Sequence, residues 1–161
     1  MSRSIGKALP VNLLDLLAGH DLARREGLTL LLVTTALDGW PHVAMLSVGE
    51  VLATGPGEVR LALWPGGGTT ANLAHSGRSL LMIVADAASY YVRLAARRGG
   101  DLSLGHGPRS FFIATIEEVL EDVVGYAEIT SGIGFRLKEP ALVLAAWTEA
   151  VAAMRSAPSL E

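Results

Sequence analysis

Runs of apolar and β-branched residues, separated by short turns that contain glycine or proline, make up most of the chain. Such runs are typical of strands. They predict six strands, at residues 28–37, 42–53, 59–64, 79–86, 89–97 and 111–124. Residues 98–109 are rich in glycine and polar side chains and are predicted to form a loop, and residues 126–137 leave room for one further short strand.

Helical patterns occur at the two ends of the chain and once between strands. The N-terminal helical segment, residues 1–22, contains an amphipathic run at Leu9–Ala18 that Gly19 ends. A short helix is expected at Thr69–His75, after the glycines of Pro65–Gly68. The C-terminal helix, residues 139–156, is predicted from Pro140 at its start and from apolar residues at helical spacing, namely Val143, Trp147, Val151 and Met154.

The spacing of these elements predicts one domain, residues 1–161, of the mainly β (α+β) class. Asp38-Gly39-Trp40-Pro41 is a turn that joins the first two strands into a hairpin. Regularly spaced strands with tight turns favour an antiparallel sheet that curls on itself, with helices at its margins. The expected architecture is a small β-barrel.

Composition adds an expectation about assembly. Half of the residues are hydrophobic, 18% are charged, the mean hydropathy is +0.40 and the net charge is −3. Because a small domain has a large surface for its volume, some apolar surface is expected to remain after the core is filled, and we expect a homodimer. The acidic balance argues against nucleic-acid binding, and no apolar stretch reaches the roughly 20 residues of a membrane span. We expect a soluble, cytoplasmic protein.

Few residues stand out as carriers of chemistry. Without cysteine, disulfides and thiolate metal sites are excluded, and the four histidines are not at metal-ligand spacing. The acidic cluster Glu117, Glu118, Glu121 and Asp122 is better explained as a solvated strand end than as a cation site. Leu63–Leu73, LWPGGGTTANL, is the exception, because a glycine loop followed by a helix start offers backbone N–H groups to a phosphate.

The order of several short motifs resembles a known family. GWPHVAMLS, then TTANL, SGRSLLMIV and YYV, within Leu28–Val92, are similar to the pyridoxamine 5'-phosphate oxidase-like proteins, the split barrels that bind flavin mononucleotide (FMN). The resemblance implies a six-stranded antiparallel split β-barrel with short flanking helices and a C-terminal helix. It also implies a homodimer with flavin sites between the protomers and a small-molecule oxidoreductase activity.

The same resemblance implies which residues hold the cofactor. The second strand would lie along the flavin ring, and the end of the third strand with the following helix start would receive the phosphate. The candidate cofactor-binding residues are His42, Val43, Ala44, Met45, Leu46, Ser47, Leu63, Trp64, Thr69, Thr70 and Asn72. It indicates no catalytic side chain and no metal site.

Two departures from the family pattern limit the prediction. The second strand has no arginine and the helix start has no basic residue, so Arg78 is the nearest candidate cation for the phosphate. The arginine and tyrosine set that holds vitamin B6 in true pyridoxamine-phosphate oxidases has no match, so oxidation of vitamin B6 is not expected. The alternatives are a deazaflavin, coenzyme F420, in the same cleft, haem bound through His42 or His75, or a non-enzymatic binding module.

Overall fold

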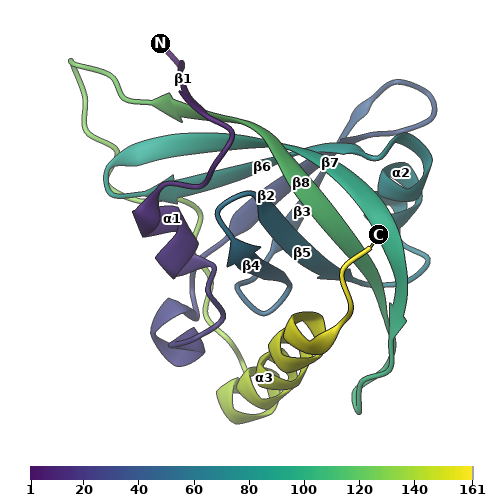
Figure 1. Cartoon of the computed structure of the whole chain (residues 1–161). Coiled ribbons are helices and arrows are strands. Elements are labelled where there is room, and N and C mark those ends of the chain that lie inside the picture. The colour runs from purple at the N-terminus through teal and green to yellow at the C-terminus, as the bar shows by residue number, and fades with distance from the viewer. Residues whose placement is uncertain (161) are drawn as a thin grey trace.

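The computed structural model describes residues 1–160, which form one curled antiparallel sheet and three α-helices (Figure 1). The strands are β1 (Arg3–Gly6), β2 (Leu30–Thr35), β3 (Pro41–Leu46), β4 (Val51–Gly55), β5 (Glu58–Leu63), β6 (Arg78–Ala85), β7 (Ala88–Leu102) and β8 (Arg109–Asp122). The helices are α1 (Val11–Leu16), a 3₁₀ turn η1 (Leu22–Arg25), α2 (Gly68–Ser76) and α3 (Pro140–Ser156). Within residues 1–160, no helix has the length and apolar character needed to span a membrane.

The strand order explains how the sheet curls. Its neighbours run β3-β2-β6-β7-β8-β5-β4, all antiparallel, with β1 added along β8. The strands β3 and β4 follow each other in the chain but lie at opposite ends of this order, and only the short turn at residues 47–50 joins them. The two ends of the sheet are therefore drawn together, and the sheet forms an open barrel.

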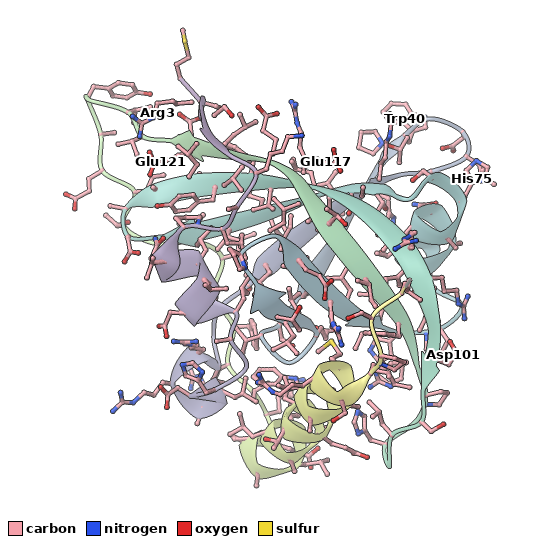
Figure 2. The ribbon with its side chains drawn as sticks, in the orientation of Figure 1. Arg3, Trp40, His75, Asp101, Glu117 and Glu121 are labelled. Carbon is pink, nitrogen blue, oxygen red and sulfur yellow. The ribbon has the colours of Figure 1, made fainter. Side chains whose placement is uncertain are left out.

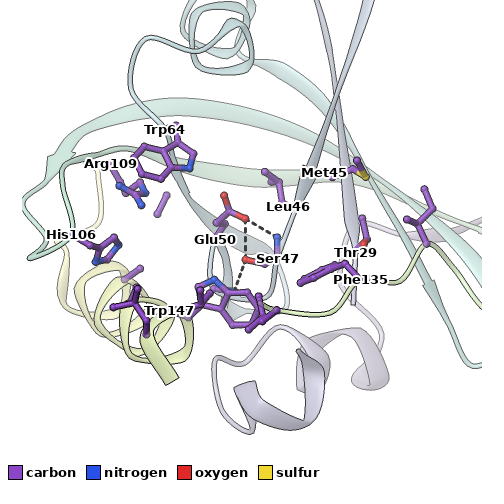
Figure 3. Close-up of a pocket in the computed structure, with 18 of the residues that line it drawn as sticks. Thr29, Met45, Leu46, Ser47, Glu50, Trp64, His106, Arg109, Phe135 and Trp147 are labelled. Atoms are coloured by element: carbon purple, nitrogen blue, oxygen red, sulfur yellow. Dashed lines mark hydrogen bonds between the residues drawn. The ribbon is translucent and has the colours of Figure 1, made fainter. Parts of the chain in front are cut away.

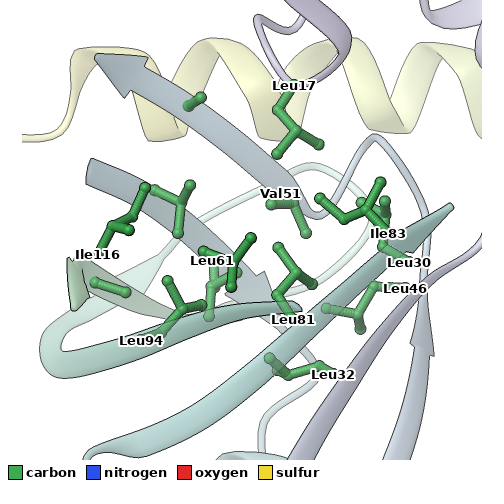
Figure 4. Close-up of a cluster of buried hydrophobic side chains, with 14 of the residues drawn as sticks. Leu17, Leu30, Leu32, Leu46, Val51, Leu61, Leu81, Ile83, Leu94 and Ile116 are labelled. Atoms are coloured by element: carbon green, nitrogen blue, oxygen red, sulfur yellow. The ribbon is translucent and has the colours of Figure 1, made fainter. Parts of the chain in front are cut away.

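Apolar side chains fill the inside of the barrel (Figure 4). Alternate residues of each strand point inward, as the period of two requires. Leu30 and Leu32 of β2 meet Leu61 of β5 and Leu81 of β6, and all four are fully buried. Burying one such side chain contributes roughly 1.5–3 kcal/mol, so the interior is the main source of stability.

The C-terminal helix α3 packs against β4, β5 and β7. Val151 and Met154 of α3 join a second buried cluster with Leu52, Ala62, Phe111 and Ile113. Arg60, which is buried on β5, donates through Nη1 to the carbonyl oxygens of Met154 at 2.7 Å and Ala157 at 2.6 Å. Since these carbonyls end the helix and lack helical partners, the arginine caps α3 and fixes it to the barrel.

The sequence predictions of class and architecture are confirmed: the protein is a mainly β split barrel with short helices and a C-terminal helix. The six predicted strands all correspond to strands, and helices occupy the predicted places near residues 9–18, 69–75 and 139–156. The sheet nevertheless has eight strands. The predicted strand at residues 42–53 forms two separate strands, β3 and β4. The eighth strand, β1, lies inside the predicted N-terminal helical segment and pairs with β8.

Three local predictions were wrong. The predicted strand at residues 42–53 is broken by the turn at residues 47–50, where Trp147 occupies the space that a side chain at Gly49 would need. The first part of the predicted loop at residues 98–109 is strand, because β7 continues to Leu102 alongside β8, and only residues 103–108 form the loop. Residues 126–137 contain no strand; Gly134 only bridges to Leu28.

Candidate functional site

The start of α2 forms one end of the candidate site. Gly66 has a positive φ of 76°, which glycine adopts without strain, and the loop then delivers α2 with Gly67 as its N-cap. Within residues 1–160, no side chain caps this helix start. His42 of β3 lies against it, with its Nε2 3.0 Å from Thr69 Oγ1. Backbone donors, a hydroxyl and an imidazole therefore meet at the positive end of the helix dipole.

Two other predicted phosphate residues of α2 point inward. Thr70 Oγ1 donates to the carbonyl oxygen of Trp64 at 2.7 Å, and Asn72 Nδ2 donates to Thr34 Oγ1 at 3.1 Å. Thr70 and Asn72 are both buried. These bonds hold α2 against β5 and β2, so the two side chains position the helix start, and Thr69 is the predicted hydroxyl that faces outward.

The predicted residues of β3 alternate between two environments. Val43 and Met45 are 54% and 69% exposed, whereas Leu46 is buried and Ala44 packs against the core. Leu63, from the predicted end of the third strand, is also a core residue. Within residues 1–160 β3 pairs with β2 alone, so its other edge is open and leaves backbone N–H and C=O groups free.

A pocket of about 740 Å³ opens where β3 ends (Figure 3). Its walls come from the end of β3, the turn that follows, Trp64, the loop before β8, residues 133–137 and α3. Four of the eleven residues predicted to bind the cofactor take part: Met45, Leu46, Ser47 and Trp64. Apolar and aromatic side chains dominate the lining; the polar side chains are those of Thr29, Ser47, Glu50, His106 and Arg109.

Glu50 is the acidic group of this pocket. Its Oε2 accepts hydrogen bonds from the backbone N–H of Ser47 at 2.7 Å and from Ser47 Oγ at 2.9 Å, as the dashed lines in Figure 3 mark. Desolvation by burial raises the pKa of Glu50, although the two Ser47 bonds and the charge of Arg109 oppose the increase. Its other oxygen, Oε1, accepts no hydrogen bond from any residue in the range 1–160.

Arg109 supplies the cation on the other side of the pocket. Its guanidinium carbon lies 3.4 Å from the ring centroid of Trp64, a stacked cation–π contact. Its Nη1 donates to the carbonyl oxygens of Gly107 at 3.2 Å and Pro108 at 2.9 Å. Burial lowers the pKa of Arg109, and the charge of Glu50 opposes that decrease. The guanidinium therefore fixes the indole and the loop before β8 together.

Hydrogen bonds join the loop before β8 to α3 on the wall of the pocket that these two segments form. His106 Nδ1 lies 3.2 Å from Glu149 Oε2 on α3, and Glu149 Oε1 accepts the Gly105 N–H at 2.7 Å. Trp147 of α3 is buried, and its ring meets Phe135 edge-on at 6.5 Å between centroids. The loop before β8, α3 and the segment around Phe135 thus form one continuous wall.

Sequence reasoning missed Glu50, Arg109 and Phe135 as pocket residues. They lie in different segments of the chain, and only the barrel brings them together. One signal was available: a single glycine inside a strand-like run, here Gly49, often marks a break, and Glu50 follows it directly. Arg78, the predicted cation for a phosphate, is misplaced for that task, because it follows the C-terminal end of α2, at the opposite end from Thr69.

The acidic cluster at the end of β8 is engaged in ion pairs. Glu118 pairs with Arg93, Glu121 with Arg3 at 2.7 Å, and Asp122 with the amino terminus at 3.2 Å; Figure 2 shows the Arg3–Glu121 pair. Among residues 1–160, no three histidine or carboxylate side chains gather as a metal site would require. The favoured explanation, a solvated strand end, agrees with these contacts.

Comparison with known proteins gives a family and a fold. No protein-family model matches the chain. The uncharacterized protein YclD of Bacillus subtilis (strain 168) is 36% identical over 135 residues, which cover 84% of this chain and 88% of YclD. In the crystal structure of a "putative pyridoxamine 5'-phosphate oxidase" from Lactobacillus delbrueckii, the similar region covers 73% of this chain and 98% of that one, with a TM-score of 0.58 at 16% identity.

A second crystal structure, HupZ from Group A Streptococcus, covers 80% of this chain and 100% of its own, with a TM-score of 0.52 at 12% identity. At these identities the structures establish the fold alone, and the fold agrees with the sequence motifs between Leu28 and Val92. The chain belongs to the same family as YclD, and its fold is the split barrel of the pyridoxamine 5'-phosphate oxidase-like proteins.

Proposed function

We propose that this protein is a homodimer that binds FMN along β3 and acts as a small flavin-dependent oxidoreductase. One observation carries the proposal: the open edge of β3 leads from the uncapped start of α2, at His42, to an apolar pocket at Met45 and Ser47. A long molecule with an anion at one end and a flat ring at the other fits this path, with the anion at α2 and the ring at the edge of the pocket, beside Met45 and Trp64. The flavin, when bound, supplies the hydride or electron chemistry.

The phosphate end would be held by the helix start. The free N–H groups there and the hydroxyl of Thr69 can donate to phosphate oxygens, and His42 lies beside them on β3. The ring of His42 lies 3.0 Å from Thr69 Oγ1, so a ring nitrogen and this hydroxyl can both reach a phosphate at the helix start. The side chains of Thr70 and Asn72 would not contact the phosphate; their hydrogen bonds to Trp64 and Thr34 hold the start of α2 in position.

The ring end would lie beside Met45 and Trp64. The exposed apolar side chains of Val43 and Met45 offer a surface to a flat ring, and the open edge of β3 offers backbone donors and acceptors to its polar atoms. No side chain here is matched to the vitamin B6 set of the family, and we do not propose vitamin B6 as the substrate.

The proposal of a homodimer rests on the outer face of the sheet. The strand registers align Met45, Leu31, Met82 and Tyr91 in one row across β3, β2, β6 and β7, and Val43, Val33 and Leu80 in the next row. All seven side chains are partly or largely exposed. A contiguous apolar face of this kind is typical of an interface, and two-fold pairing is the commonest closed arrangement.

The test is the visible spectrum of the purified protein, followed by titration with FMN. We expect saturable binding of about one FMN per protomer. His42→Ala should weaken FMN binding about tenfold or more, the loss expected for one charge-assisted hydrogen bond. His75→Ala is the matched control, since His75 lies in the last turn of the same helix, and it should leave the affinity unchanged.

Other outcomes would replace the proposal. A protein that ignores FMN but binds coenzyme F420 would be a deazaflavin protein with the same cleft. A protein that binds neither would be a non-enzymatic module, which the absence of lysine and arginine at residues 65–72 favours. If the wild type and His42→Ala bind FMN with equal affinity, the phosphate does not bind at the start of α2.

A further inference from the structure

The pocket beside the end of β3 has the size and lining of a small-molecule site. Its volume of about 740 Å³ lies within the usual range, roughly 300–1,000 Å³, for ligand pockets. Trp64, Phe135 and Trp147 provide aromatic surfaces in its walls, and Leu142 and Val143 of α3 add apolar ones. A flat organic molecule would therefore find favourable contacts on both sides.

The polar groups of the pocket select among such molecules. Ser47 holds one oxygen of Glu50 with two donors, which fixes the carboxyl group and leaves Oε1 as a free acceptor beside the cavity. Oε1 is not among the fully buried side-chain atoms that lack a partner, so it is open to the cavity. Because Ser47 already fixes the carboxyl group, a ligand that donates to Oε1 forms the bond at little ordering cost. The most direct complement to Oε1 is an O–H or N–H group.

The charges of the pocket favour an uncharged ligand. Arg109 and Glu50 carry opposite charges on two walls of the same cavity, and His106 is already paired with Glu149. The pocket is thus close to balanced before any ligand enters. A ligand with a net charge would lose its hydration without gaining an unpaired partner, which is unfavourable in an apolar site.

We propose that this pocket binds a flat, uncharged organic molecule that donates a hydrogen bond from an O–H or N–H group to Glu50 Oε1. The pocket adjoins Met45 and Trp64, where the proposed function lays the flavin ring. Its occupant would lie beside that ring and would be the molecule on which the flavin acts. This last assignment rests on the proposed function, whereas binding in the pocket does not.

The experiment measures binding by equilibrium dialysis to the flavin-free protein, with ligands matched in shape. 2-Naphthol has the flat ring and the donor, 2-methoxynaphthalene lacks the donor, and 2-naphthoate carries a negative charge. We expect 2-naphthol to bind at one per protomer, and the other two to bind at least about tenfold more weakly, as the loss of one hydrogen bond to a charged group predicts. Equal binding of 2-naphthol and 2-methoxynaphthalene would overturn the proposal.

Two pairs of variants locate the site. Ala146 lines the pocket and its neighbour Ala145 is exposed on α3, so Ala146→Phe should abolish 2-naphthol binding while Ala145→Phe retains it. Glu50→Leu should reduce the preference for 2-naphthol over 2-methoxynaphthalene to about one. Should Glu50→Leu fail to fold, the alanine pair still decides: unchanged binding in Ala146→Phe places the ligand elsewhere and refutes the proposal.

Titration of the same preparations with FMN separates this proposal from the proposed function. Donor-dependent naphthol binding without FMN binding would leave the pocket standing and remove the flavin function. FMN binding without donor-dependent naphthol binding would support the flavin function and refute the proposed ligand of the pocket. Competition, in which saturating FMN displaces 2-naphthol, would mean that the flavin itself fills the pocket and would overturn the assignment of a separate ligand.

Discussion

Glu50 combines two features that seldom occur together outside functional sites: a largely buried carboxyl group and a free oxygen facing a cavity. Burial alone would disfavour the charged form, and the two donors of Ser47 compensate only in part. The positively charged and titratable groups that share its pocket are Arg109 from β8 and His106 from the loop before it. The carboxyl group is therefore a source of pH-dependent stability.

The first prediction concerns that dependence. The pKa of Glu50 in the folded protein lies above the ordinary carboxyl value of 4.5, so the folded state binds this proton more tightly than the unfolded chain. The stabilisation is complete below that value and is lost as the pH rises through the raised pKa. Denaturant unfolding from pH 4 to 8 should show the free energy of unfolding of the wild type falling relative to that of Glu50→Gln.

Glu58 provides the control with the opposite sign. Desolvation would raise the pKa of Glu58, but hydrogen bonds from Thr54 and Arg60 and the charge of Arg60 outweigh it and lower the pKa. Its stabilisation is present above 4.5 and is lost as the pH falls through the lowered pKa. With the measurement extended down to pH 3, the free energy of unfolding of the wild type should fall relative to that of Glu58→Gln as the pH decreases, the opposite direction to the Glu50 pair. Parallel slopes for both pairs would refute the assignment.

Arg109 is expected to stabilise the fold as well as the pocket. Arg109→Leu removes two hydrogen bonds to loop carbonyls and the stacked contact with Trp64. We expect a loss of about 2–3 kcal/mol in the free energy of unfolding, measured with urea. A hydrogen bond from a charged donor is worth about 1.5–3 kcal/mol, and a cation–π contact with an exposed ring such as Trp64 adds about 0.5–1 kcal/mol. Arg97→Leu, at an exposed position of β7, should change it by less than about 0.5 kcal/mol.

The residues that could be predicted from the sequence are those whose neighbours lie close by in the chain. His42, Met45 and Trp64 are candidates that the family resemblance places on a strand and a strand end; the structure puts Met45 and Trp64 in the walls of one pocket and His42 at the start of α2. Glu50 and Arg109 could not be identified, because their meeting depends on which strands pair across the barrel. The inward turn of Thr70 depends on the same packing, since its partner, the Trp64 carbonyl, is set by the loop between them.

At the scale of elements, strand ends were harder to predict than strand existence. The strand β7 runs on through Arg97-Arg98-Gly99-Gly100-Asp101, a composition that ordinarily predicts a loop. It stays extended because β8 pairs along its whole length, with Gly99 leaving space for the ring of Phe111. Pairing with a strong apolar partner strand thus overrode local propensity, which one strand's own sequence does not reveal.

The turn between β3 and β4 depends on one small residue. A Cβ at Gly49 would overlap the ring of Trp147, which also contacts Phe135. Gly49→Ala should therefore destabilise the protein by about 1–3 kcal/mol, the usual cost of overpacking, and shift the fluorescence of Trp147. Gly57→Ala is the control, because nothing lies within 4 Å of a Cβ there; a loss of stability in both variants would point to backbone effects rather than to the tryptophan.

At the scale of the whole molecule, the apolar residues exceed what the core needs. Many of them fill the barrel and the second buried cluster beneath α3, and part of the remainder forms the outer rows led by Met45–Leu31 and Val43–Val33. The strand β3 is also an open edge, and exposed apolar edges promote association with another chain. The expectation of a homodimer, drawn from composition, thereby gains a specific surface, on the same strand as the proposed flavin site.

The last prediction tests that surface through Leu80, which ends one apolar row and is not among the candidate flavin residues. Leu80→Glu places a carboxylate across from Arg93, so the folded protomer should tolerate it, while an apolar interface should not. In sedimentation equilibrium we expect a wild-type dimer and a Leu80→Glu monomer. Val11→Glu, at an exposed position of α1, is the control and should remain a dimer.

The same variant tests where the cofactor binds. If the flavin lies between protomers, Leu80→Glu should also lose FMN affinity. A monomeric variant that binds FMN as tightly as the wild type would place the whole cofactor site within one chain, and a dimeric Leu80→Glu would move the interface to another face.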